Sequence, residues 1–425
     1  MALSSSMWQE DVSIEIMEKI VKKTISIGNY IRMSAVCKSW RSMFAHEHVK
    51  PSDVEAPWLL QLKDCEYNDH IGFNFYSLSD GRFYSFKIPN HILNKYPKVA
   101  QGPAYCFSTS NGWLVLIVGP NHNPDMFLFD PISEIDVNLP SLTTVPTLLF
   151  QPDYIITPSL VLSVQVFSVS DDLTKNLIVA AIFRDEVNNR EILGFCNCDI
   201  GVVEEESSWK IFADERNIRY QSLLFHAGKL HALILNLDNE FESDKRIVDE
   251  INHVIVLKPD YCEVKLYHIQ ACDNEVNIAH SGLKYIYLAK SITGELLIVW
   301  DWTDPYYEDE DEDEDDDNII IYPTGKLTIQ RYEDMCKTSK KFEYVTNLGD
   351  QAVFVSPNSN SFSIPATSGN ECQENCVYFT MDAINTLGQK SQIINRQSGV
   401  YCMQEGRIRR PFPYPPIWFQ PRLRN

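Results

Sequence analysis

Helical spacing of apolar side chains is confined to the N-terminal part of the chain, between residues 8 and 46. In a first segment these side chains cover roughly half of the helix circumference: Ile14, Ile16, Met17, Ile20, Val21 and Ile25. Gly28-Asn29 then interrupts the pattern and offers an N-cap for a second helix. There, an apolar arc of about 140° contains Met33, Val36, Cys37, Trp40, Met43 and Phe44. Two short helices with such wide apolar faces cannot cover each other completely, so apolar surface is left over.

From Pro57 onward the pattern changes to that of β-strands. About sixteen short runs rich in Val, Ile, Leu, Phe and Tyr alternate with turn residues; examples are GWLVLIV (112–118), KNLIVAAIF (175–183) and ELLIVWDW (295–302). Between these runs the pattern leaves room for at most one helix of normal length, around Tyr332–Lys340. This part of the chain is therefore predicted to be all-β.

A loose repeat within the β region suggests its architecture. Turns that combine an aromatic residue with glycine recur at 107–118, 225–235 and 290–300. Four strands per unit and about five or six units would account for the region, which is typical of a β-propeller. A pair of β-sandwiches is the alternative. The predicted fold is mainly β, with a helical domain at 1–50 and a β-propeller-like domain at 51–425.

The net charge of −21 disfavours nucleic acid and anionic membrane as partners. About half of it lies in the ten acidic residues 308–317, EDEDEDEDDD. Like charges at this density repel each other, so a disordered loop is expected at 305–318. It is interpreted as a tolerated surface insertion, with attraction of basic partners as the alternative.

Cysteine usage and the N-terminus indicate the compartment. The eleven cysteines are scattered and odd in number, which argues against a disulfide scaffold. There is no N-x-S/T glycosylation site, the N-terminus does not resemble a signal peptide, and no apolar run is long enough to span a membrane. We expect an intracellular protein of the cytoplasm, the nucleus or both.

The sequence offers little catalytic or metal-binding chemistry. It contains no glycine-rich phosphate-binding motif and no nucleophile elbow. Cys196 and Cys198 alternate with Asn197 in a predicted strand, so both should face the core. Cys372 and Cys376 lie in the loop-like GNECQENC, where a metal or redox role is the alternative to a structural one. No catalytic residue, metal site or cofactor is predicted.

One stretch could support an enzyme or a lectin. Asp301 and Asp304 lie in the aromatic segment WDWTDPYY, which combines sugar-stacking rings with carboxylates. A β-propeller glycosidase or lectin is therefore an alternative. A Trp-Asp pair at a strand end is also common in the packing of propeller blades.

The N-terminal helices resemble the F-box motif. The match consists of Trp8, Val12, Glu15-Ile16, Ile20 and the segment 31–41, which ends in VCKSWR. The rest of the chain is similar to the C-terminal domain of plant F-box proteins of the kelch-like KIB type. The matching stretches are SDVEAPWLLQL (52–62), STSNGWLVLI (108–117), FLFDPIS (127–133), SLLFHAGKLHAL (222–233), LGDQAVFVSPNSNSFSIPA (348–366) and NCVYFT (375–380).

The resemblance implies a non-catalytic substrate receptor of an SCF-type ubiquitin ligase. The F-box would bind a Skp-type adaptor, and through it a cullin, while the β domain would hold an unknown target protein. By family position the adaptor contacts would be Val12, Ile16, Ile20, Ile31, Val36, Cys37 and Trp40. A scaffold protein that carries an F-box but acts outside a ligase is the alternative. Val12-Ser13 replaces the Leu-Pro that usually starts the first F-box helix, which would weaken adaptor binding.

The C-terminal segment 407–425, RIRRPFPYPPIWFQPRLRN, combines arginine, proline and aromatic residues. We expect it to pack back across the propeller, because Trp418 and Phe419 need cover. A polyproline-like docking segment is the alternative.

Overall fold

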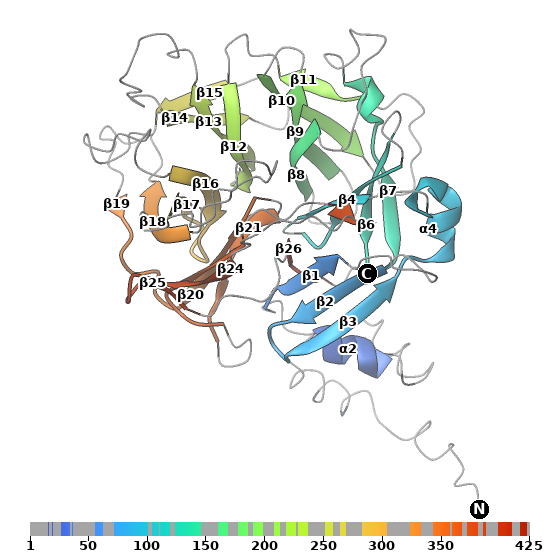
Figure 1. The fold of residues 1–425 in the computed structure, drawn as a ribbon, viewed down its shortest axis with the longest axis horizontal. Coiled ribbons are helices and arrows are strands. Elements are labelled where there is room, and N and C mark those ends of the chain that lie inside the picture. The colour runs from blue at the N-terminus through green and yellow to red at the C-terminus, as the bar shows by residue number, and fades with distance from the viewer. Residues whose placement is uncertain are drawn as a thin grey trace, which may run out of the picture.

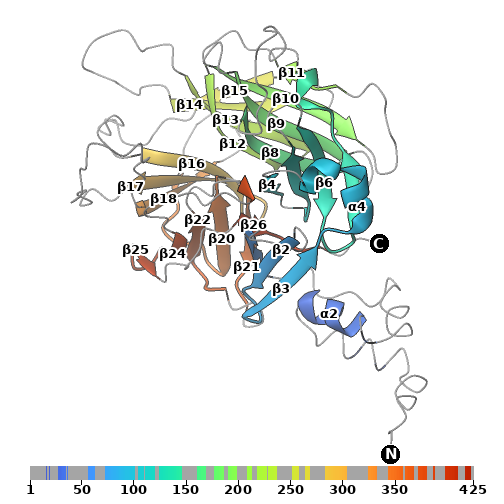
Figure 2. The same ribbon diagram turned by 45° about the vertical axis from the view of Figure 1, so that its right-hand side comes forward.

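The computed structural model describes a propeller of strands and a short N-terminal helix (Figures 1 and 2). The described residues are 16, 19, 27–34, 36, 56–62, 72–100, 104–109, 111–119, 124–145, 160–168, 177–185, 190–198, 208–212, 218–226, 228–236, 251–257, 264–268, 283–303, 324–332, 343–357, 359–367, 372–380, 386–387, 398–409 and 417–422. The acidic segment 305–318 lies outside them. No helix in these residues is long and apolar enough to cross a membrane.

The strands that the structure describes form five hydrogen-bonded sheets, arranged radially as the blades of a β-propeller. Sheet one has the order β26-β1-β2-β3 and contains β1 (Trp58–Leu62), β2 (Gly72–Ser77), β3 (Arg82–Lys87) and β26 (Ile417–Phe419). A second sheet contains β8 (Val161–Ser168), β9 (Leu177–Asp185), β10 (Arg190–Cys198) and β11 (Lys210–Phe212). A third contains β12 (Ile218–His226), β13 (Lys229–Asn236), β14 (Ile251–Leu257) and β15 (Val264–His268). The fourth contains β16 (Leu283–Lys290), β17 (Leu296–Thr303), β18 (Thr324–Tyr332) and β19 (Glu343–Tyr344).

The fifth sheet has ten strands and combines two groups. One group is the meander β4 (Ala104–Ser108), β5 (Leu114–Val118), β6 (Asp125–Asp130) and β7 (Ile135–Asn138). The other, called here the last group of strands, is β20 (Gln351–Ser356), β21 (Ser359–Pro365), β22 (Cys376–Thr380), β24 (Ser398–Cys402) and β25 (Arg407–Arg409). They meet at the single parallel pair Ser359↔Ser108, and β23 (Thr386–Leu387) also pairs with β4. The propeller prediction is thus confirmed, in preference to the pair of sandwiches.

The C-terminal strand completes the first sheet. β26 pairs antiparallel with β1, Trp58 opposite Phe419 and Leu60 opposite Ile417. Side chains alternate along β26: Ile417 and Phe419 join the core between the first sheet and β4–β6, whereas Trp418 points into the core of the last group of strands. The expectation that the tail packs back across the propeller is confirmed for residues 417–422.

The turn before β5 explains one of the glycine motifs. Gly112 has a φ of +76°, which favours glycine, and a Cβ at this position would come within 3.2 Å of the Gln420 carbonyl oxygen. The close approach of the C-terminal segment thus adds a second reason for glycine in this SNGW turn.

Three short helical elements of the β region have no counterpart in the predicted elements. α4 (Asn90–Lys95) and the 3-10 helix η1 (Pro97–Ala100) follow β3, and a second 3-10 helix, η2 (Leu142–Thr144), follows β7. The aromatic ring of Tyr96 stacks on Phe127 at 3.9 Å, and its hydroxyl donates a hydrogen bond to Asp136 Oδ2 at 2.9 Å. Six residues are too short for a helical period to stand out from the sequence, so tertiary packing defines α4.

The N-terminal helices differ in part from the prediction. α2 (Ile27–Ser34) includes Gly28-Asn29, so the predicted break there is wrong. The helix also ends at Ser34, and Val36 lies in a bend, its amide donating to the Met33 carbonyl oxygen at 3.2 Å. Gly28 is tolerated inside α2 because the helix packs against the propeller at this position.

Candidate functional site

Helix α2 is attached to the first sheet, beside β3 in both views (Figures 1 and 2). Ile27 is buried in the same apolar cluster as Trp58 and Tyr84. Tyr84 in turn stacks on Trp58, with ring centroids 4.9 Å apart and planes 3° from parallel. Part of the apolar surface that the two N-terminal helices could not cover is therefore covered by the propeller itself.

A polar contact fixes the same helix. The Arg32 guanidinium lies 4.9 Å from the Tyr84 ring centroid and donates to both Tyr84 Oη and Asp80 Oδ2, the latter at 3.4 Å. Tyr84 Oη donates to the same Asp80 oxygen at 2.5 Å. Asn29 Oδ1 accepts a further bond from Arg32 at 3.1 Å. These contacts hold α2 in one orientation on the first sheet.

The substitution Gly28→Ala tests whether α2 packs on the first sheet, because packing reverses the sign of the expected change in the free energy of unfolding. In an exposed helix the change would stabilise by about 1 kcal/mol. Here a Cβ would overlap the hydroxyl and ring of Tyr84, so we expect a loss of about 1–3 kcal/mol from overpacking. Urea denaturation followed by tryptophan fluorescence measures the difference. A gain in stability would show that α2 does not pack on Tyr84.

The structure describes three of the seven residues assigned to adaptor contact by resemblance. Ile16 is 51% exposed and Val36 is 63% exposed, whereas Ile31 is partly buried against the cluster that contains Trp58 and Tyr84. Of these three side chains, those of Ile16 and Val36 are therefore exposed, and that of Ile31 faces the propeller. Val12, Ile20, Cys37 and Trp40 lie outside the described residues.

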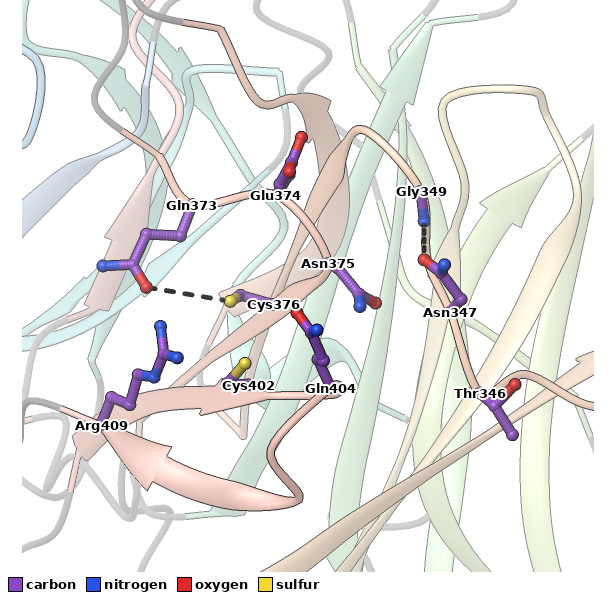
Figure 3. Close-up of a pocket in the computed structure, with 10 residues that line it drawn as sticks. All are labelled: Thr346, Asn347, Gly349, Gln373, Glu374, Asn375, Cys376, Cys402, Gln404 and Arg409. Carbon is purple, nitrogen blue, oxygen red and sulfur yellow. Dashed lines mark hydrogen bonds between the residues drawn. The ribbon is translucent and has the colours of Figure 1, made fainter.

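A polar pocket of about 700 Å³ lies beside the last group of strands (Figure 3). It is lined by Thr346, Asn347, Gly349, Gln373, Glu374, Asn375, Cys376, Cys402, Gln404 and Arg409. Gln373 and Arg409 lie on one side of the view, and Thr346 and Asn347 on the other. Four of the ten lining residues carry neutral amides, which both donate and accept hydrogen bonds, so the pocket suits a polar ligand such as a peptide segment.

Asn375 holds the pocket walls together. It has a φ of 55°, a backbone conformation that asparagine tolerates better than most residues. Its amide donates to the Gln351 carbonyl oxygen at 3.0 Å, and its own carbonyl accepts from Met403 at 3.1 Å. Its side-chain oxygen accepts from the Leu348 amide at 2.8 Å. One residue thus connects the walls before β20, before β22 and after β24, which the sequence pattern did not identify.

The cationic residue of the pocket lining, Arg409, is paired with a neighbouring carboxylate. Arg409 Nε donates to Glu405 Oε2 at 2.6 Å, and Arg407 Nε donates to the same oxygen at 2.9 Å. These hydrogen bonds, that from Arg409 first, lower the pKa of Glu405 to about 2 and raise the pKa of Arg409. Glu405 therefore stays ionised and holds Arg409 in place across the physiological pH range.

The carboxylate proposed for a glycosidase is not accessible. Asp301 is 1% exposed within β17, and Asp304 lies outside the described residues. Trp300, which precedes Asp301 in β17, is also buried, and its indole nitrogen donates to Gln330 Oε1 at 3.1 Å. Trp300 is thus bound within its blade instead of presenting its ring to a ligand.

The cysteine pairs have different surroundings. Cys196 and Cys198 face one cluster of the core while Asn197 is exposed, as predicted from their alternation. Cys372 and Cys376 belong to another buried cluster. Within the described part of the chain, no three His, Cys, Asp or Glu side chains are grouped so as to hold a metal ion.

Comparison with models of protein families gives a match that spans most of the chain. A family model described as KIB1-4 beta-propeller matches residues 75–402. No curated protein matches the sequence.

Solved structures of similar arrangement share little sequence with the chain. An alpha-L-arabinanase of Penicillium chrysogenum has 9% identity and a TM-score of 0.36, with 75% of this chain and 83% of that chain covered. The GH93 alpha-L-arabinofuranosidase of Fusarium graminearum has 9% identity and a TM-score of 0.34, covering 71% and 75%. The Aleuria aurantia lectin has 8% identity and a TM-score of 0.28, covering 78% and 83%. Similarity at this level does not inform on ligand or reaction.

Proposed function

Because the chain belongs to the KIB1-4 beta-propeller family, we propose that it is the substrate-recognition subunit of an SCF-type ubiquitin ligase. In this proposal the N-terminal F-box-like segment binds a Skp-type adaptor, and the propeller holds a target protein. The chain itself has no catalytic role, since ubiquitin transfer is carried out by the other subunits.

The main support for adaptor binding is that some apolar residues near the N-terminus are exposed, whereas others are buried against the propeller. Ile16 and Val36 expose more than half of their surface, although large aliphatic side chains are normally buried. Both are positions that the F-box resemblance assigns to the adaptor. Ile27, from the same segment, is instead buried against the propeller. A partner helix that covers the exposed positions would gain apolar burial of about 25 cal/mol per Å².

The polar pocket supports the second part of the proposal, the binding of a target protein. Its amide side chains and the held Arg409 provide hydrogen bonds for a peptide or side chain of a protein partner. The restraint of its walls by Asn375 means that little ordering would be needed on binding.

Reconstitution tests the proposal. The full-length chain is mixed with a purified Skp-type adaptor and a cullin and analysed by size-exclusion chromatography with light scattering. We expect a stable complex of all three. Failure of the chain to bind the adaptor at micromolar concentration would overturn the proposal, whereas binding to the adaptor without recruitment of the cullin would favour a non-ligase scaffold.

A further inference from the structure

Two cysteines that line the polar pocket lie directly opposite each other. Cys376 begins β22 and Cys402 ends β24, and the two are register partners in the antiparallel pair. They are far apart in sequence, whereas Cys372 lies close before Cys376. Figure 3 shows their side chains next to each other at the pocket.

The hydrogen-bond pattern fixes the type of pair that they form. One position further along the ladder, the Met403 amide donates to the Asn375 carbonyl oxygen at 3.1 Å. Because hydrogen-bonded and non-hydrogen-bonded pairs alternate, Cys376 and Cys402 occupy a non-hydrogen-bonded pair, in which Cα atoms are about 4.5 Å apart and side chains are closest. A disulfide accepts Cα separations of about 4.4–6.8 Å, so this pair can be bridged without moving the strands.

Both thiols are reduced in the structure and border the pocket. Cys402 is 5% exposed and Cys376 is 1% exposed. The Cys376 thiol donates weakly to Gln373 Oε1 at 4.0 Å. A small reagent that enters the pocket therefore meets two adjacent sulfur atoms.

We propose that Cys376 and Cys402 are a modification site at which a small disulfide, such as glutathione disulfide, forms a reversible intramolecular disulfide bond. The Cys402 thiolate attacks one sulfur of the reagent and releases one thiolate, leaving a mixed disulfide. The Cys376 thiolate then attacks the Cys402 sulfur and releases the second. The two protein thiols are oxidised, the reagent is reduced to two thiols, and these take up the two protons.

The bond would join two walls of the pocket covalently. Cys376 adjoins the wall formed by residues 373–375, and Cys402 precedes the turn that carries Gln404 and leads into β25, which ends at Arg409. Redox state would thereby change the freedom of both walls and the access to the space between them.

The rate of the reaction should depend on pH. Burial, followed by the proximity of Cys402, raises the pKa of Cys376 to about 12; the charge of Arg409 lowers this pKa and that of Glu405 raises it. The thiolate is the attacking species, so its fraction grows about tenfold per pH unit below that pKa. We therefore expect bond closure to be slow at neutral pH and up to about tenfold faster for each unit of increase.

Peptide mapping of the full-length chain tests the proposal. The native chain is incubated with glutathione disulfide, alkylated, digested without reductant and analysed by mass spectrometry. We expect a linked pair of peptides containing Cys376 and Cys402, lighter by two hydrogen atoms than the reduced peptides, and its loss after dithiothreitol treatment. A Cys402→Ser variant should lose the linked pair, and a Cys196→Ser variant should retain it.

Three results would overturn the proposal. They are linkage of Cys376 to Cys372, persistence of glutathione on either cysteine, and complete alkylation of both cysteines after prolonged incubation at pH 9. The unmutated chain gives each of these outcomes directly, so the test does not depend on the folding of a variant.

Discussion

Replacing Trp418 with alanine should lower the free energy of unfolding by about 3–5 kcal/mol, the cost of removing a fully buried large aromatic side chain. Trp418 is fully buried in the cluster formed by the last group of strands. Its ring meets Phe354 edge-on, with centroids 5.0 Å apart, and its indole nitrogen donates to the Val355 carbonyl oxygen at 3.1 Å. The variant loses this donor and leaves a cavity where the first sheet meets the last group.

Urea denaturation, with the midpoint and slope compared between variants, measures the effect. Phe83→Ala is the matched control, because Phe83 is an aromatic residue of the same first sheet that is 60% exposed. We expect the control to change stability by no more than about 0.5 kcal/mol. Equal effects of the two substitutions would contradict the burial of Trp418 between the first sheet and the last group of strands.

The double substitution Ile16→Ala and Trp40→Ala should abolish binding to the Skp-type adaptor. Buried aromatic and aliphatic anchors supply most of the energy of an interface, and loss of a hot-spot residue typically costs at least about 2 kcal/mol. Two such losses would weaken binding by about a thousandfold if they are additive. Isothermal titration calorimetry with the purified adaptor measures the change.

Ile31→Ala is the control for this experiment, and the structure gives it a different expected outcome. Ile31 is partly buried against the first sheet, so its truncation should lower stability while leaving adaptor affinity within about threefold, or 0.65 kcal/mol. Loss of affinity in the Ile31 variant would instead show that Ile31 contributes to adaptor binding. Full binding by the double variant would refute the assignment of Ile16 and Trp40.

The strands were predictable because their signal is local. Segments such as Leu114–Val118 and Leu177–Asp185 are apolar runs between turn residues, and they form β5 and β9. The helix around Gly28 was predicted less well, since glycine lowers helix propensity and only the Tyr84 ring, distant in sequence, accounts for its place. Helix α4 depends in the same way on the contact of Tyr96 with Phe127.

The pocket could not be predicted because its walls come from separate parts of the chain. Asn375 connects them through bonds to residues before β20 and after β24, which no spacing along the sequence encodes. The cysteine pair shows the same limit: Cys372 and Cys376 are close in the sequence, yet the strand register places Cys402 opposite Cys376. Register depends on the turns and on the whole sheet.

The position of β26 has a consequence during synthesis on the ribosome. The strand that completes the first sheet is made of residues 417–419, whereas its partner β1 begins at Trp58. At the usual rate of translation, β1 is made roughly 20–70 s before β26. During that interval the hydrogen-bonding edge of β1 and the apolar face around Trp58 lack their final cover, so nascent chains are candidates for chaperone binding until residues 417–419 leave the ribosome.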